Sequence, residues 1–205
     1  MSTDKILGTG RIIPVLAFHS TEEALLTAQA LVDGGVNRLE VTLRTPVALD
    51  SVSAIAENIS DAVVGVGTVL KPEQLIAAKR AGARFAISPG LTESLAECVA
   101  DQQFPFIPGV ATVSEAMRAR ELGFNLLKFF PAEQSGGAAF LKSVSSVLPD
   151  ISFCPTGGVN PDNARSYLDL PNVRAIGGSW LVKRHENGTI DCDATLAAAK
   201  ESQRL

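Results

Sequence analysis

A lysine stands inside an otherwise apolar stretch of this chain. Lys128 lies between two leucines and two phenylalanines, and Pro131 closes the run. A lysine in such a segment often extends its charged end to solvent, and that is the plain structural alternative. Burial and nearby positive charge favour the neutral amine, which attacks carbonyl carbon and forms a Schiff base. The segment therefore indicates a nucleophilic lysine in apolar surroundings.

A second candidate group occupies one face of a predicted strand. Successive side chains of a strand point to opposite faces, so residues of equal parity lie together. The polar face comprises Arg38, Glu40, Thr42 and Arg44, and the other face comprises Leu39, Val41 and Leu43. An ordinary sheet with one face in water would also explain this alternation. In a parallel sheet covered by helices, Glu40 and Arg44 would point inside, and Arg44 is the expected source of positive charge near Lys128.

Two glycine pairs lie near the C-terminal end of the sequence. Gly157-Gly158 follows one predicted strand, and Gly177-Gly178 ends the next and is followed by Ser179. A glycine pair alone is more often a turn than a ligand site. Bare backbone N–H groups can, however, approach an anion closely, and phosphate sites use the loops after the last two strands of a barrel. The two pairs together favour a phosphate site.

Short β-branched or apolar runs alternate with amphipathic stretches along nearly the whole chain. This alternation is typical of βα units with a parallel sheet. The eight predicted strands are 12–18, 37–43, 62–68, 84–88, 105–109, 125–130, 151–156 and 173–178. Eight units in 205 residues predict an α/β fold with a single (β/α)₈ TIM barrel spanning 1–205 as one domain. An open doubly wound sheet, usually with five or six strands, is the alternative.

Cap-like residues mark the predicted helices between these strands. Helix starts are predicted at Ser20 or Thr21, Thr92, Thr112 and Asn160, with Pro72 and Pro161 in first turns and a last helix over 193–202. Three helices are expected to end at glycines in the segments VDGGVNRL, KRAGARFA and RELGFNLL. A barrel built this way places its reactive groups at the carboxyl ends of the strands.

Composition and charge exclude several classes of function. The formal net charge of −4 makes nucleic acid a poor default partner. Three widely spaced cysteines without a CxxC motif are typical of reduced cytoplasmic thiols, and two histidines cannot build a His-rich metal site. No apolar run reaches the roughly 18 residues that span a membrane, and the start lacks a signal-peptide pattern. We therefore expect a cytoplasmic protein without a metal or a membrane partner.

Six co-linear motifs give the chain a family resemblance. RLEVTLRT, GVGTVL, FAISPG, LLKFFPAE, CPTGGV and IGGSWL occur in the order and spacing of the 2-dehydro-3-deoxy-6-phosphogluconate (KDPG) aldolase family, across about 12–182. The resemblance implies a class I aldolase without metal or cofactor, built as a (β/α)₈ barrel and usually a homotrimer. It implies cleavage of the phosphorylated keto acid to pyruvate and glyceraldehyde 3-phosphate in the Entner-Doudoroff pathway.

The resemblance also implies roles for individual residues. Lys128 would form the Schiff base, and Glu40 would be the general acid and base. The implied substrate-binding residues are Arg44 and Thr68 at the pyruvyl carboxylate, Pro89 and Phe130 around the three-carbon fragment, Thr156 for stereochemistry, and Gly157, Gly158, Gly178 and Ser179 at the phosphate. One departure is Val66, where the family has alanine, which puts fine selectivity in doubt.

Two other functions remain open at the level of sequence. The same chemistry could act on 2-dehydro-3-deoxy-6-phosphogalactonate or 4-hydroxy-2-oxoglutarate, which share the pyruvyl half. A sugar-phosphate binding barrel without catalysis is the more distant alternative, because a fold and phosphate loops do not by themselves make an enzyme.

Overall fold

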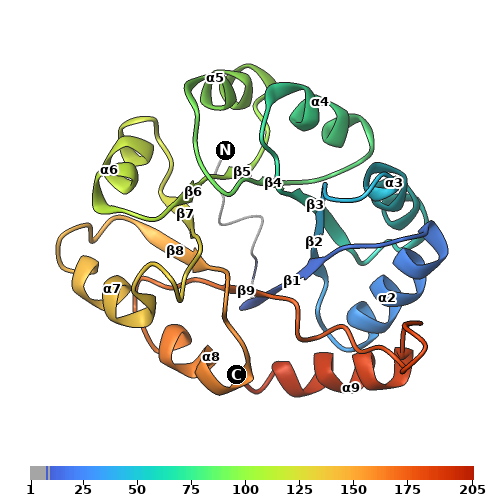
Figure 1. Ribbon diagram of the computed structural model, residues 1–205. Coiled ribbons are helices and arrows are strands. Elements are labelled where there is room, and N and C mark those ends of the chain that lie inside the picture. Colours follow the sequence, from blue (N-terminus) through green and yellow to red (C-terminus); the bar gives the residue numbers. More distant parts are fainter. Residues whose placement is uncertain (1–7, 9) are drawn as a thin grey trace.

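The computed structural model describes Gly8 and residues 10–205 of the chain. Strands and helices alternate through these residues, with the strands gathered centrally and the helices around them (Figure 1). The strands are β1 (Ile12–Leu16), β2 (Arg38–Thr42), β3 (Val63–Gly67), β4 (Ala86–Ile87), β5 (Phe106–Ile107), β6 (Gly109–Val110), β7 (Leu126–Phe129), β8 (Ser152–Pro155) and β9 (Ile176–Gly178). The helices are α2 (Thr21–Asp33), α3 (Ala48–Asn58), α4 (Pro72–Arg80), α5 (Glu93–Gln102), α6 (Val113–Glu121), α7 (Gly137–Val144), α8 (Pro161–Leu168) and α9 (Cys192–Ser202).

Every pairing between these named strands is parallel. One sheet has the order β5-β4-β3-β2-β1-β9, and a second has the order β6-β7-β8. Parallel neighbours require a crossover, and here the helices provide it on the outside of the curled sheet (Figure 1). The predicted α/β class with parallel strands is thereby confirmed.

A proline separates the two sheets on one side. The sequence predicts one strand over 105–109, but the structure has two short strands, β5 and β6, on either side of Pro108. Proline lacks the N–H that a central strand needs for its ladder. The Pro108 carbonyl still accepts a hydrogen bond from the Lys128 backbone N–H at 2.8 Å. The prediction of a continuous strand is therefore wrong at this residue.

On the other side, the sheets are joined by isolated bridges. Phe153 of β8 bridges Val173, and Thr156 bridges Gly177 of β9. The Phe153 N–H donates to the Asn172 carbonyl at 2.7 Å, and its carbonyl accepts from the Arg174 N–H at 3.0 Å. The carboxyl ends of β8 and β9 therefore lie side by side.

Several strands are shorter than the sequence predicts. The run 84–88 contains the strand Ala86–Ile87 alone, and the run 173–178 contains Ile176–Gly178. Phe85 and Ser88 flank β4 and are buried nevertheless. An apolar run in the sequence indicates which residues are buried. Buried residues extend beyond those that form the regular hydrogen-bonded ladder, so the run is longer than the strand.

The helix boundaries follow the predicted capping residues. Ser20, Thr92, Thr112 and Asn160 each accept a hydrogen bond from a backbone N–H of the first turn, and Thr112 and Asn160 form capping boxes. The last helix begins at Cys192, one residue earlier than predicted, because Asp191 caps it through the N–H of Ala194. The three predicted glycine turns have positive φ, at Gly35, Gly82 and Gly123.

Two apolar clusters lie on opposite sides of the strands. The larger cluster fills the space between sheet and helices and includes Leu39, Val41, Leu127 and Phe129. The smaller cluster lies on the inner side and comprises Ile13, Phe85, Ile87, Ile107, Leu126, Cys154 and Ala175. The alternation along β2 and β7 thus assigns each side chain to the outer or the inner side.

A buried tyrosine ties helix α8 to the loop after β7. Tyr167 is fully buried, and its hydroxyl donates a hydrogen bond to the Glu133 carboxylate. Burial raises the pKa of Tyr167 above its ordinary value, and the accepting carboxylate of Glu133 raises it further. The neutral phenol is therefore the form that the folded chain stabilises.

This raised pKa gives a stability prediction with a definite sign. The stabilisation is fully present below the unfolded-state pKa of about 10 and is lost as pH rises toward the higher folded-state value. Tyr167→Phe should lower the free energy of unfolding by about 1 kcal/mol at pH 7 and should flatten the decline of stability above about pH 10. Urea unfolding between pH 7 and pH 11 measures both effects. Equal alkaline slopes for the two proteins would contradict the prediction.

Candidate active site

The amine of Lys128 meets the carboxylate of Glu40 on the inner side of the sheet. Lys128 Nζ lies 3.3 Å from Glu40 Oε1, and the two residues are 5% and 1% exposed. They come from β7 and β2, which are far apart in sequence. The polar parity of β2 predicted that Glu40 points inside, and its contact with Lys128 agrees. Lys128 does not extend to solvent, so that alternative is excluded.

The packing of β7 dictates the direction of the lysine. Leu127 and Phe129 belong to the outer cluster, and Leu126 belongs to the inner one. Lys128 shares the parity of Leu126 and therefore points inside. Its strand neighbours in register are Gly109 and Cys154. The lysine side chain consequently lies on the same side of the sheet as the inner apolar cluster.

A glycine leaves the space that the Glu40 carboxylate occupies. A Cβ atom at Gly67 would lie 2.0 Å from Glu40 Oε1, much closer than real Cβ contacts allow. Gly67 ends β3, beside Thr42 in register. Any side chain at Gly67 would displace the carboxylate from the amine. The sequence marks this residue as part of GVGTVL, but its steric role requires the structure.

The charged group beside the lysine amine is the Glu40 carboxylate, at 3.3 Å. The influence of positive charge from Arg44 on the amine stays a prediction. A carboxylate offsets the charge of a buried ammonium group. It is also a base within reach of the amine's proton, which the amine must release before it attacks a carbonyl. The pair can therefore hold and move one proton.

Two further side chains complete the surroundings of the amine. The ring centroid of Phe130 lies 5.2 Å from Lys128 Nζ. Cys154 is buried, and burial together with the Glu40 carboxylate raises the pKa of its thiol to about 12. The thiol therefore remains neutral and does not compete with Glu40 for protons.

Arg44 stands at the carboxyl end of β2, past Glu40 on the same face. It is exposed, and its Nε donates a hydrogen bond to Thr42 Oγ1 at 3.1 Å. Thr42 is buried and donates its own hydroxyl hydrogen to the Leu16 carbonyl at 2.7 Å. The sequence placed Thr42 on the polar face without a role, and the structure shows it between Glu40 and Arg44.

Thr68 and Pro89 follow the ends of β3 and β4. Thr68 has φ of 62°, a left-handed conformation that is rare for a β-branched residue and costs roughly 1–3 kcal/mol. Such strain persists where the surroundings fix it, commonly at functional sites. Pro89 and Phe130 line one small cavity of about 110 Å³, together with Gly109. Lys128 and Glu40 are not among the residues that line this cavity, and Phe130 connects it with the pair because its ring also lies near Lys128 Nζ.

The two glycine pairs come together at the carboxyl ends of β8 and β9. Thr156 bridges Gly177, so Gly157-Gly158 and Gly178-Ser179 leave the sheet from adjacent points. Gly157 and Gly158 have φ of 102° and 80°, which other residues rarely adopt. The ring of Trp180 covers Gly178, where a Cβ would lie 1.7 Å from Cζ3. Gly157 is half-buried and Gly158 is exposed, whereas Gly178 is buried beneath Trp180.

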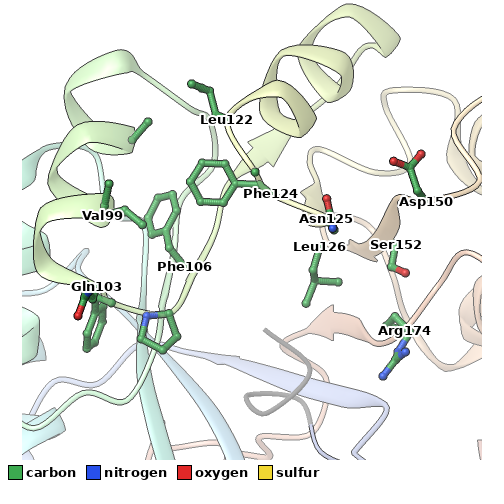
Figure 2. A pocket seen from close by; sticks show the side chains of 15 residues that line it. Val99, Gln103, Phe106, Leu122, Phe124, Asn125, Leu126, Asp150, Ser152 and Arg174 are labelled. Carbon is green, nitrogen blue, oxygen red and sulfur yellow. The ribbon is translucent and has the colours of Figure 1, made fainter. Parts of the chain in front are cut away.

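A larger cavity lies at the opposite ends of the strands. Its volume is about 740 Å³, and Figure 2 shows Phe106, Phe124 and Leu126 on its walls, with Asp150 and Arg174 at one side. Phe106 and Leu126 begin β5 and β7, so the cavity opens at the amino ends of the strands. The Lys128–Glu40 pair is not among its lining residues. This larger cavity is therefore separate from the Lys128–Glu40 pair.

Within Gly8 and residues 10–205, no three His, Cys, Asp or Glu side chains gather as a potential metal site. No helix in that same part of the chain combines the length and apolar character needed to cross a membrane.

Known proteins resemble the chain in both sequence and structure. A family model described as "Aldolase: KDPG and KHG aldolase" matches residues 3–195. The KHG/KDPG aldolase of Escherichia coli (strain K12) is 47% identical over 201 residues, which cover 98% of this chain and 94% of that protein.

Two crystal structures share the fold over nearly the full length. The 2-keto-3-deoxy-6-phosphogluconate aldolase of Zymomonas mobilis ZM4 with 3-phosphoglycerate has a TM-score of 0.93 and 42% identity, covering 98% of this chain and 94% of that one. The KDPG aldolase of Legionella pneumophila, with pyruvate captured at low pH as a covalent carbinolamine intermediate, has a TM-score of 0.93 and 41% identity, covering 98% of each chain. The chain belongs to the KDPG and KHG aldolase family.

Proposed function

We propose that this chain is a class I aldolase that cleaves 2-dehydro-3-deoxy-6-phosphogluconate to pyruvate and glyceraldehyde 3-phosphate, the reaction of the Entner-Doudoroff pathway. The observation that carries the proposal is the buried Lys128–Glu40 pair at the carboxyl ends of the strands. The covalent pyruvate adduct of the Legionella pneumophila relative supports the same chemistry.

The reaction begins at the amine of Lys128. After Glu40 accepts its proton, the amine attacks the C2 carbonyl carbon to give a carbinolamine. Glu40 returns that proton to the carbinolamine hydroxyl, which leaves as water, so that a protonated imine forms and Glu40 is again a carboxylate. Glu40 removes the C4 hydroxyl proton, directly or through a water, the C3–C4 bond breaks, and its electron pair enters the imine to give an enamine. Glyceraldehyde 3-phosphate leaves. Protonation of the enamine at C3 and hydrolysis of the imine then release pyruvate, and the protonated imine supplies the electron sink.

The remaining site residues recognise the two ends of the substrate. Arg44 presents planar donors to the pyruvyl carboxylate, with Thr68 assisting. Pro89 and Phe130 pack around the three-carbon fragment. The phosphate and the hydroxyl-bearing carbons near it are assigned to Thr156, Gly157, Gly158, Gly178 and Ser179. Backbone N–H groups at Gly157 and Gly158 suit an anion because a glycine has no side chain of its own. An anion at Gly178 would lie against the ring of Trp180.

We further propose that the two sheets form one closed (β/α)₈ barrel and that 1–205 is a single domain. The Phe153–Val173 and Thr156–Gly177 bridges support closure on one side. The Lys128–Pro108 hydrogen bond supports continuity across the proline on the other. With β5 and β6 counted as one interrupted strand, the order becomes that of eight successive parallel strands.

Trapping of the Schiff base tests the proposed function. Incubation with pyruvate and borohydride should reduce the imine and leave a stable adduct on Lys128, located by peptide mass.

Glu40→Gln should lower kcat by roughly 10²–10⁴-fold because the proton acceptor is lost. Lys128→Ala should abolish turnover while phosphorylated compounds still quench the single tryptophan, Trp180, which covers Gly178. Unmodified protein, or an adduct elsewhere, would refute the mechanism, and a protein that binds without any turnover would be the non-catalytic barrel.

Substrate choice is tested by comparing epimers. We expect kcat/KM to be highest for the phosphogluconate derivative. It should be lower for 2-dehydro-3-deoxy-6-phosphogalactonate, because Thr156 is the residue assigned to stereochemistry, and lower for 4-hydroxy-2-oxoglutarate, because that acid lacks the phosphate. The three ratios of kcat/KM decide the order. A preference for the galactonate epimer, or for the unphosphorylated acid, would reverse the assignment.

We also propose a homotrimer, which the family resemblance implies. Leu70 and Met117 are large apolar side chains that lie 57% and 47% exposed in the single chain, as surfaces buried in an assembly do. Light scattering at micromolar concentration should give about three times the chain mass of 21.5 kDa. A single-chain mass under those conditions would contradict the proposal.

A further inference from the structure

We propose that Thr42 is a positioning residue that fixes the guanidinium of Arg44 for the substrate carboxylate. The inference rests on the proposed function, because it concerns the residue assigned to the pyruvyl carboxylate. It is carried by two hydrogen bonds that share one oxygen: Arg44 Nε to Thr42 Oγ1 at 3.1 Å, and Thr42 Oγ1 to the Leu16 carbonyl at 2.7 Å.

The direction of these two bonds is fixed by chemistry. The Leu16 carbonyl can only accept, so the single hydroxyl hydrogen of Thr42 points to it. Guanidinium nitrogens can only donate, so Arg44 Nε must use a lone pair of the same hydroxyl. The Thr42 hydroxyl therefore has one orientation, and that orientation presents an acceptor to Arg44.

Thr42 is itself held rigidly. It is 2% exposed and pairs in register with Gly67, and the next residue, Leu43, donates its N–H to the Gly67 carbonyl at 2.9 Å. The bond to Leu16 adds a link to β1 on the other side. Contacts with β1 and β3, together with its place in β2, therefore hold Thr42 in position. Arg44, in contrast, lies beyond the end of β2 and is exposed.

Anchoring at Nε determines which edge of the guanidinium meets the ligand. With Nε bound to Thr42, the two terminal Nη groups remain to form parallel hydrogen bonds with both oxygens of a carboxylate. A long exposed arginine otherwise loses several rotamers when it binds, which weakens affinity. Thr42 therefore reduces the side-chain entropy that Arg44 loses when the ligand binds. It also directs the carboxylate to the two Nη groups, each of which donates to one oxygen.

A set of four variants tests this role. Thr42→Val removes the hydroxyl and keeps the shape, and Thr42→Ser keeps the hydroxyl. Arg44→Ala removes the guanidinium, and the double variant combines Thr42→Val with Arg44→Ala. For each, borohydride trapping against pyruvate concentration gives the half-saturating concentration and the maximal rate, and steady-state cleavage of the phosphogluconate derivative gives KM and kcat.

Thr42→Val should raise the half-saturating pyruvate concentration and KM by about tenfold, the size expected for losing one hydrogen bond to a charged group, with kcat changed less than threefold. Thr42→Ser should stay within about twofold of the wild type. In the Arg44→Ala background, Thr42→Val should have almost no further effect on KM, because the bond it removes is already absent.

A matched control separates this effect from a general loss of packing. Thr27 is a fully buried threonine in α2, and its Oγ1 has no hydrogen-bond partner among the described residues. Thr27→Val makes the same chemical change away from the site and should leave KM unaltered. If Thr42→Val does not fold, Thr42→Cys replaces the hydroxyl by a weakly bonding thiol of similar size and should raise KM in the same direction.

The outcomes distinguish this inference from the proposed function. A wild-type protein that neither forms the adduct nor cleaves the substrate refutes the proposed function. An active wild type in which Thr42→Val and Arg44→Ala act additively, or in which Thr42→Val lowers kcat alone, refutes the positioning role and leaves the aldolase intact. Loss of the Thr42→Val effect in the Arg44→Ala background supports it.

Discussion

The structure is organised around one buried ion pair. Lys128 and Glu40 come from strands far apart in sequence and meet 3.3 Å apart with almost no solvent contact. Removing two charges from water costs several kcal/mol for each ion, and only close opposite charge and a fixed geometry offset that cost. The inner apolar cluster below the pair, the glycine at position 67 and the neutral thiol of Cys154 all meet this requirement. Packing around the pair thus fixes the positions of the two groups that can share a proton.

The sequence predicts which side chains face inside, because parity along a strand is a local property. Glu40 and Lys128 follow from alternation in β2 and β7. The distance between the two groups is not local, since it depends on how two strands and a glycine pack together. For the same reason, no sequence pattern shows that Tyr167 binds Glu133, or that Thr42 supports Arg44.

Some boundaries of helices and strands can likewise be predicted from the sequence, and others cannot. The helix starts at Thr112 and Asn160 were predictable because a cap is a contact between residues three apart. The two ends of β4 and the start of β9 were not, because ladder pairing depends on neighbouring strands, and buried residues such as Phe85 continue the apolar pattern past the ladder. Pro108 is the intermediate case. Its missing N–H is visible in the sequence, but the apolar residues around it read as one strand.

Under the proposed mechanism, the chemical step and substrate recognition depend on different parts of the structure. The reacting pair is buried and held by packing on both sides of the sheet, so a change there disturbs the core as well as the reaction. Arg44 and the paired glycines stand beyond the strand ends, where they are anchored by hydrogen bonds or by backbone conformation. Residues beyond the strand ends can change with little effect on the core, because few core contacts depend on them. Under the proposed mechanism, a change at the strand ends would therefore alter substrate preference while the Lys128–Glu40 pair and its packing stay intact.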